Sequence, residues 1–196
     1  RDRSRAEGRH RPDHRGKILK FSETDVIYDF RRRFADYKRP ELAFRDPVRL
    51  RNILENHNAH YIMAGRVHAG DNIMQEKMRK IFAVVDSDDY LREHVHYLAD
   101  YDEKLALALS AGCNISINVP IVGLEACGTS WMKDVANMNV LISTHDGGVA
   151  DGSINSYLNV SGADEAEEVD MLYQRMEEAA ATWKYDFDLE YIIQQQ

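Results

Sequence analysis

The stretch HYIMAG at residues 60–65, with the helical pattern that follows it over residues 72–85, decides the fold class of this chain. Residues 61–64 are apolar or small and run directly into a glycine, which is typical of a buried strand that ends in a turn. Apolar side chains then recur with a period near 3.6, at Ile73, Met74, Met78, Ile81, Phe82 and Val85. A buried strand followed by an amphipathic helix is one unit of an α/β fold.

The same alternation recurs along most of the chain. Further strands are predicted at residues 26–30, 94–99, 114–119, 140–144 and 157–160. Further helices are predicted at residues 47–56, 103–111, 130–137 and 163–183. Because strands that alternate with helices pair in parallel, the pattern predicts a Rossmann-like, mostly parallel sheet with helices on both faces.

The beginning of the chain differs in composition from the rest. Its first 20 residues hold eight Arg or Lys and almost no large apolar side chains. Such a segment cannot bury surface, so we expect an exposed basic arm or linker over residues 1–23 and one α/β domain over residues 24–196. No aromatic residues alternate with these arginines, so nucleic acid is not an expected partner.

Composition excludes several classes of protein. The 196 residues are 44% apolar, enough to bury a core. The sequence has no run of 18 apolar residues and no secretory leader, so we expect no membrane span and a cytoplasmic location. Its two cysteines, Cys113 and Cys127, cannot form a disulfide scaffold, and no Cys/His spacing is typical of zinc sites.

Charge is distributed unevenly along the chain. The whole sequence has 25 basic and 33 acidic residues, a net charge of −8, but residues 1–51 alone hold 16 basic and 9 acidic side chains. An excess of positive charge in this first part favours an anionic ligand near it.

Two turns at the expected ligand-binding edge carry groups that suit an anion. Parallel sheets bind ligands beyond the carboxyl ends of their strands. The turn after the first strand is RRRFADYKR at residues 31–39, in which Arg32, Arg33 and Lys38 offer positive charge. The turn after the fourth strand ends in Gly-Thr-Ser at residues 128–130, where glycine and free N–H groups can approach an anion closely. Together they predict a phosphate clamp; an ordinary helix cap and a solvated arginine run are the alternatives.

Lys133 lies one turn into the helix that follows. Its neighbours Trp131, Met132, Val135 and Ala136 are apolar or small. A desolvated lysine beside a phosphate site is a good amine nucleophile for a carbonyl, which is what pyridoxal phosphate requires. A solvated surface lysine is the alternative.

The segment EACGTSWMK at residues 125–133 resembles the signature E-A-[SC]-G-T-x-x-M-K of the α-glucan (glycogen, maltodextrin, starch) phosphorylases, whose lysine binds pyridoxal 5'-phosphate. FRRRFADYKR at 30–39, AGRVHAGD at 64–71 and ISTHDGG at 142–148 are similar to further segments of that family, in the same order. The resemblance covers about residues 24–183. It implies a fold similar to the C-terminal half of a GT-B glycosyltransferase.

The resemblance also implies roles for the matching residues. Those implied to bind the cofactor are Lys133, Arg32, Thr129, Ser130 and Tyr101. Those implied to bind the sugar or the substrate phosphate are Glu125, Ala126, Cys127, Gly128, Tyr37, Arg33 and Lys38. The implied catalytic residues are Lys133, Arg33 and Lys38, and no metal is implied. Three positions depart from the family pattern: Trp131 replaces a small or polar residue, Met138 replaces a glycine, and Arg66 replaces a lysine.

The activity implied by the resemblance is the release of glucose 1-phosphate from the ends of an α-1,4-glucan by inorganic phosphate. In this family the active site lies between the domain seen here and an N-terminal domain. We therefore expect the chain to be incomplete alone, as a fragment, a subunit of a split enzyme or a diverged homologue. A missing domain or partner chain would complete the site, and a homo-oligomer is a further expectation.

Two alternative functions stay open on the sequence. Residues 125–128 and 147–151 also resemble the E-P-C-G and G-G-L-x-D segments of starch and glycogen synthases, retaining enzymes that use a nucleotide sugar. Those synthases hold the diphosphate with an Arg-x4-Lys pair, here Arg33 and Lys38, but lack a counterpart of Met132-Lys133. The other alternative is a catalytically silent module for sugar binding or assembly.

Overall fold

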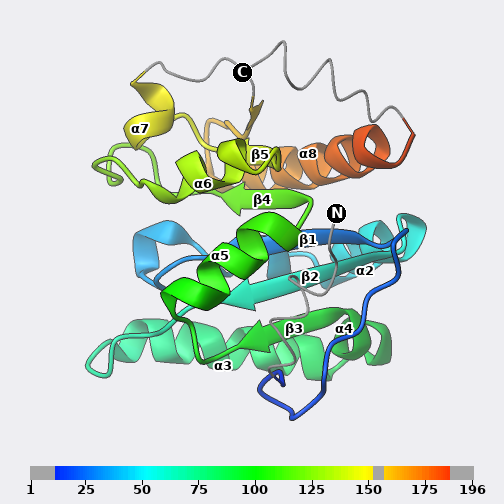
Figure 1. Ribbon diagram of the computed structural model, residues 1–196. Coiled ribbons are helices and arrows are strands. Elements are labelled where there is room, and N and C mark those ends of the chain that lie inside the picture. The colour runs from blue at the N-terminus through cyan, green and yellow to red at the C-terminus, as the bar shows by residue number, and fades with distance from the viewer. Residues whose placement is uncertain (1–11, 152–156, 186–196) are drawn as a thin grey trace.

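The computed structural model describes residues 12–151 and 157–185 and contains a single six-stranded sheet in that part of the chain (Figure 1). Its strands are β1 (Val26–Arg31), β2 (Ala59–Ala64), β3 (Val95–Leu98), β4 (Ile115–Asn118), β5 (Val140–Ser143) and β6 (Leu158–Asn159). Their order is β3-β2-β1-β4-β5-β6, and every neighbouring pair is parallel. This is the strand order of a Rossmann-type doubly wound sheet, so the predicted fold class is confirmed.

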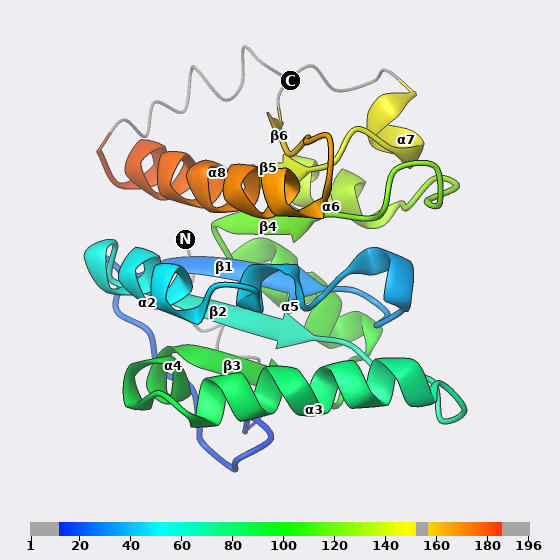
Figure 2. The same cartoon turned by 180° about the vertical axis from the view of Figure 1, so that it is seen from behind.

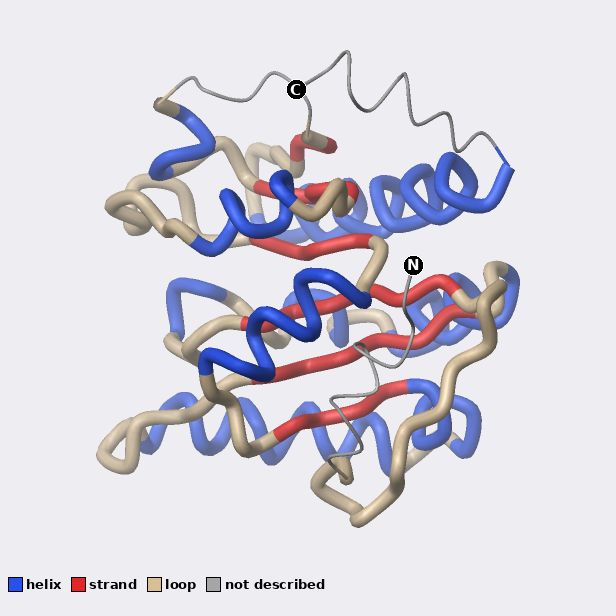
Figure 3. The backbone as a smooth tube through the Cα atoms, viewed as in Figure 1, coloured by secondary structure: helices blue, strands red, loops and turns tan. Residues whose placement is uncertain are grey.

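Helices lie on both faces of the sheet, and Figure 3 shows blue helices in front of the red strands and behind them. On one face lie α5 (Glu103–Gly112) and α6 (Ser130–Ala136), and on the other lie α2 (Pro47–Asn56), α3 (Asn72–Asp86) and α8 (Glu165–Tyr185) (Figures 1 and 2). The shorter helices are α4 (Asp89–His94), α7 (Gly147–Ala150) and the 3-10 turns η2 (Asp36–Lys38) and η3 (Leu42–Phe44).

Aspartates fix the start of several helices. The carboxylate of Asp46 accepts a hydrogen bond at 3.0 Å from the backbone N–H of Arg49, the third residue of α2. Asp71, Asp88 and Asp102 do the same for α3, α4 and α5. The cap at Asp88 begins a six-residue helix that the sequence did not predict, and this helix includes His94, which we had expected in the third strand.

The core divides between the two faces of the sheet. On the α2, α3 and α8 side, the hydroxyl of Tyr28 donates to the carbonyl of Met176 at 2.7 Å, so that a buried polar atom ties β1 to α8. A second cluster joins Ile27 of β1 to Leu105 and Leu109 of α5. Side chains of β1 are thus packed into the core on both faces of the sheet, and β1 leads directly into the basic turn.

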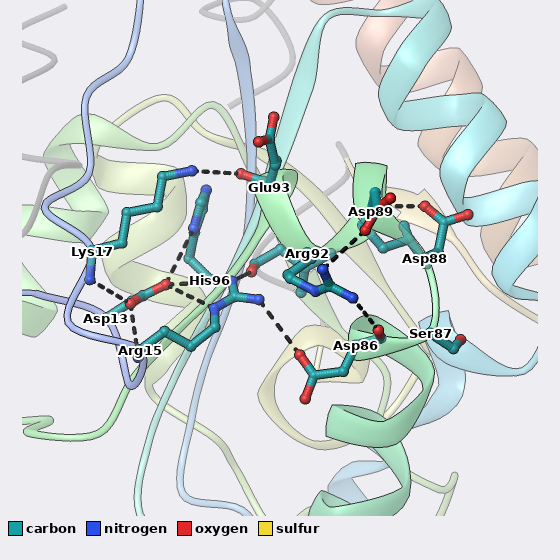
Figure 4. Close-up of polar contacts among 12 residues, drawn as sticks. Asp13, Arg15, Lys17, Asp86, Ser87, Asp88, Asp89, Arg92, Glu93 and His96 are labelled. Atoms are coloured by element: carbon teal, nitrogen blue, oxygen red, sulfur yellow. Dashed lines mark hydrogen bonds and ion pairs between the residues drawn. The ribbon is translucent and has the colours of Figure 1, made fainter.

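Most side chains of residues 12–23 are exposed, but the segment lies against the β3 edge of the sheet. The buried carboxylate of Asp13 accepts hydrogen bonds from the backbone N–H groups of Arg15 and Lys17 at 2.9 Å each (Figure 4). The guanidinium of Arg15 donates to the carbonyl of Val95 in β3 at 2.6 Å, and Leu19 is buried in the second cluster. Polar contacts and the buried apolar side chain of Leu19, rather than a large apolar surface, hold this segment on the β3 edge. Residues 1–11 lie outside the described residues.

Candidate functional site

The loops after β1 and β4 meet where the strand order reverses. Doubly wound folds bind ligands beyond the carboxyl ends of the strands at this point. The first loop leads from β1 into η2, and the second leads from β4 to α6; both lie at the left of Figure 1. The backbone N–H of Ile121 donates to the carbonyl of Tyr37 at 2.7 Å and joins the two loops. The sequence-predicted site residues therefore come from the two strands that flank the switch point.

Arg32 crosses from the first loop to α6. Its Nη1 donates to the hydroxyl of Ser130, its Nε donates to the carbonyl of Ile117 at 3.1 Å, and its Nη2 lies 3.6 Å from Oδ2 of Asp134. The side chain is buried, and burial together with the charge of Arg31 lowers the pKa of Arg32 to about 10. The guanidinium therefore remains positive at neutral pH and binds the first and fifth residues of α6.

A buried charge network that the sequence reasoning missed lies directly beneath. Arg31 forms ion pairs with Asp29 and Asp134, and Asp134 also accepts from the hydroxyl of Ser116 at 2.9 Å. All of these side chains except that of Ser116 are charged, and all four are buried. Burial raises the pKa of Asp29, and the charge of Arg31 opposes that shift. The signal was present in the sequence, because an aspartate inside the apolar strand VIYDF requires a buried partner.

Lys38 and Glu125 form the second link between the loops. The ammonium of Lys38 donates to the carboxylate of Glu125 and lies 4.9 Å from the centroid of the Tyr37 ring. Both side chains of the ion pair are largely buried, with 12% and 10% of their surfaces exposed. The residues expected to bind phosphate and sugar are thus joined to each other in this structure.

Asp146 holds the loop that carries Glu125. Its Oδ2 accepts from the backbone N–H of Glu125 at 2.9 Å. Burial alone would raise the pKa of Asp146, but hydrogen bonds from the backbone N–H groups of Glu125, Gly123, Gly147 and Leu124 lower it below its ordinary value. Asp146 therefore stays ionised and fixes the loop backbone.

The remaining expected residues lie around these links. Lys133 is exposed on α6, one turn after Ser130, whereas Arg33 is exposed just after β1. Within the described residues neither side chain forms an ion pair. Thr129 occupies the position before α6, but its side chain makes no capping hydrogen bond, so it does not act as the ordinary cap considered above.

Tyr101, Ala126 and Cys127 complete the set of expected residues. Tyr101 is half-buried in the loop after β3; burial raises the pKa of Tyr101, and the positive charges of Arg31 and Arg32 act against that shift. Ala126 and Cys127 are exposed, and the carbonyl of Cys127 accepts from the backbone N–H of a residue in α7 at 2.7 Å. The structure therefore gathers the expected residues at one edge of the sheet.

Comparison with known proteins identifies the family of this chain. The model of the carbohydrate phosphorylase family matches residues 18–195. The chain belongs to the carbohydrate phosphorylase family.

Curated relatives agree with this assignment. The chain is 34% identical over 129 residues to a glycogen phosphorylase of Mycobacterium tuberculosis, which covers 65% of this chain and 15% of the relative. It is 35% identical over 130 residues to a glycogen phosphorylase of Aquifex aeolicus, and this match covers 65% of this chain and 19% of the relative. It is 33% identical over 137 residues to a maltodextrin phosphorylase of Thermococcus litoralis, and this match covers 69% of this chain and 16% of the relative. The matched segments are thus at most about a fifth of the length of these relatives.

A solved structure supports the fold. A UDP-forming α,α-trehalose-phosphate synthase from Burkholderia xenovorans is similar with a TM-score of 0.59 and 14% sequence identity, over 88% of this chain and 45% of that chain. The fold is therefore that of one part of a GT-B glycosyltransferase. In the described part of the chain, no helix is long and apolar enough to cross a membrane, and no group of three or more His, Cys, Asp or Glu is placed to hold a metal ion.

Proposed function

We propose that this chain is the cofactor- and phosphate-binding domain of an α-1,4-glucan phosphorylase, which releases glucose 1-phosphate from the ends of an α-glucan. The observation that carries the proposal is the contact between Arg32 and Ser130. It brings a guanidinium from the β1 loop to the helix that bears Lys133, within a chain of the carbohydrate phosphorylase family. A cation, a hydroxyl and a primary amine then lie within one turn of α6.

The donor set fits pyridoxal 5'-phosphate. Lys133 offers an exposed amine for the aldehyde, and Ser130 lies three residues earlier, on the same side of the helix. Arg32 is fixed by Ile117 and Ser130 but keeps guanidinium N–H groups beyond these two bonds. Thr129 adds a second hydroxyl, and Tyr101 would line the ring. When bound, the cofactor would supply a second phosphate group that exchanges a proton with the substrate phosphate.

The other groups bind and orient the substrates in this proposal. Arg33 and Lys38 offer a forked and a point-like positive charge to inorganic phosphate. Glu125 accepts hydrogen bonds from sugar hydroxyls, and the backbone N–H groups of residues 126–128 donate to the sugar. Tyr37 packs beside the bound ring. The role of Glu125 needs the loop geometry that Asp146 maintains.

The chain alone is expected to be inactive towards glucans. Its sugar- and phosphate-binding groups all lie at one edge of one sheet, while catalysis requires both reactants to be oriented and water to be excluded. Orientation alone is worth about 7–11 kcal/mol of barrier, and a second wall is needed to provide it. A missing domain or partner chain would supply that wall. Incubation with maltoheptaose and phosphate should therefore yield glucose 1-phosphate only after a second polypeptide is added.

The cofactor assignment is tested by trapping. The full chain is incubated with pyridoxal 5'-phosphate, scanned for absorbance above the protein band, reduced with borohydride and mapped by peptide mass. We expect one adduct, on Lys133, which is lost in Lys133→Arg and kept in the control Lys80→Arg, an exposed lysine of α3. A colourless protein, or label spread over surface lysines, would contradict the assignment and favour the synthase-type or silent alternative.

A further inference from the structure

Several cations at the ligand edge of the sheet are already paired with carboxylates of the chain itself. Arg31 and Arg32 share Asp134, which is buried on the inner side of α6. Lys38 is paired with Glu125. These two carboxylates differ in their surroundings, because Asp134 lies within a packed network whereas Glu125 lies on a loop between two elements. Only the second could move aside without disrupting the core.

Two glycines shape the place where the Glu125 side chain lies. Gly128 has a φ of +67°, and a Cβ there would lie 3.1 Å from both Cγ and Cδ of Glu125. Gly147 has a φ of +54°, and a Cβ there would lie 3.0 Å from Cγ of Glu125. Both backbone conformations favour glycine, and both leave space that a side chain would fill. The loop is therefore built to let the Glu125 carboxylate lie back towards Lys38.

We propose that Glu125 acts as an internal competitor for the anion site: its carboxylate occupies Lys38 in the unliganded chain, and inorganic phosphate binds by displacing it. The displaced carboxylate then becomes available to sugar hydroxyls. This regulation rests on the proposed function, since it assigns phosphate to Lys38 and sugar to Glu125. It adds an order of binding, with phosphate first and sugar second.

Charge and tethering explain how such a competition can be balanced. Inorganic phosphate carries a charge between −1 and −2 at neutral pH and three or more acceptor oxygens, so it is a stronger partner for an ammonium than one carboxylate is. The Glu125 carboxylate compensates by being tethered, which gives it a high effective concentration beside Lys38. The pair should therefore weaken phosphate binding without abolishing it. Because coupling is reciprocal, phosphate should also strengthen the binding of sugar.

The test measures binding of inorganic phosphate to the full chain by calorimetry. Glu125→Gln keeps the size of the side chain and removes its charge, and we expect it to bind phosphate about three- to tenfold more tightly. Glu125→Ala, which leaves no amide in place of the carboxylate, should show a gain in the same direction. The matched control is Glu165→Gln. Glu165 is the first residue of α8 and forms an exposed ion pair with Arg45, so this variant removes the same charge away from the site and should leave the phosphate affinity within about twofold.

A double-mutant cycle isolates the pair. In a Lys38→Met background, Glu125→Gln should no longer change the phosphate affinity, because the cation for which the carboxylate competes is gone. Circular dichroism and thermal unfolding confirm that each variant is folded. If the parent binds phosphate and both Glu125 variants bind it equally well or more weakly, Glu125 does not compete with phosphate. That result would leave the proposed function unaffected. Phosphate binding by none of the proteins contradicts the proposed function itself, and the competitor with it.

Discussion

Replacing Asp134 by Asn should destabilise the protein more than any exposed substitution near the site. The carboxylate of Asp134 is buried, forms ion pairs with Arg31 and Arg32, and accepts from the hydroxyl of Ser116 at 2.9 Å. With Asp29 it provides two negative charges for two buried guanidiniums. Asn has nearly the same volume, so the substitution creates no cavity and removes only the charge.

The expected loss of stability follows from the balance between the buried carboxylates and the buried guanidiniums. Removing one partner of a buried ion pair costs about 3–5 kcal/mol, because the opposite charge stays buried without compensation. The side-chain amide oxygen that Asp134→Asn introduces would still accept from Ser116, so we expect the lower end, about 3 kcal/mol. For a domain of this size such a loss lowers the melting temperature by about 6–12 °C.

Urea unfolding followed by circular dichroism measures the change, with equal m-values required for the comparison. The control is Glu178→Gln, which breaks an exposed pair with Arg175 on α8 and should cost less than about 1 kcal/mol. If Asp134→Asn unfolds within about 1 kcal/mol of the parent, the two guanidiniums do not need this carboxylate, and the charge-balance argument is wrong.

Two further predictions concern the sheet. Burial lowers the pKa of His60 to about 3 and also lowers the pKa of His96, so the unfolded chain binds more protons than the folded chain once the pH falls below about 6.5. Stability should therefore drop by about 2 kcal/mol between pH 7.5 and 5.5, and by less in His60→Gln; equal urea midpoints at both pH values would contradict this. A Cβ at Gly65 would overlap the carbonyl oxygen of Arg32, so Gly65→Ala should lower the free energy of unfolding by about 3 kcal/mol. In the control Gly70→Ala the new Cβ meets nothing closer than 3.6 Å, so thermal unfolding should show little change from the parent.

The regular elements were predictable because their signals are local. All six strands lie within one or two residues of the positions expected from apolar runs, and the helices longer than six residues were all expected. The helices α4 and α7, with six and four residues, are too short to show a periodic pattern. The exact strand order was not derivable from periodicity, since it depends on contacts between segments distant in sequence.

The sequence indicated which residues lie together at the candidate site, but not which of them form ion pairs with one another. The sequence indicated that Arg32, Lys38 and Glu125 would meet at one edge, because parallel strands end together. It treated the cations as free for a ligand, whereas the structure pairs Lys38 with a carboxylate 87 positions along the chain and places Arg32 3.6 Å from Asp134. Such pairs carry no periodic or spacing signal, and only the fold brings them together. The number of charged residues in a motif therefore does not show how many of them are free to bind a ligand.

Two of the three departures from the family pattern, Trp131 and Met138, are accommodated away from Lys133. Trp131 is buried against Leu141 and Val149, beneath α6 and α7, and so does not occupy the exposed side of the helix where Lys133 lies. Met138 keeps a φ of +56°, the left-handed conformation that glycine adopts without strain, so the turn after α6 is retained at a cost of about 1–2 kcal/mol. Both substitutions thus change packing and backbone strain behind the helix, and both leave the amine, the hydroxyl of Ser130 and the guanidinium of Arg32 on its ligand side. Neither position therefore gives a reason for this chain to lose cofactor binding.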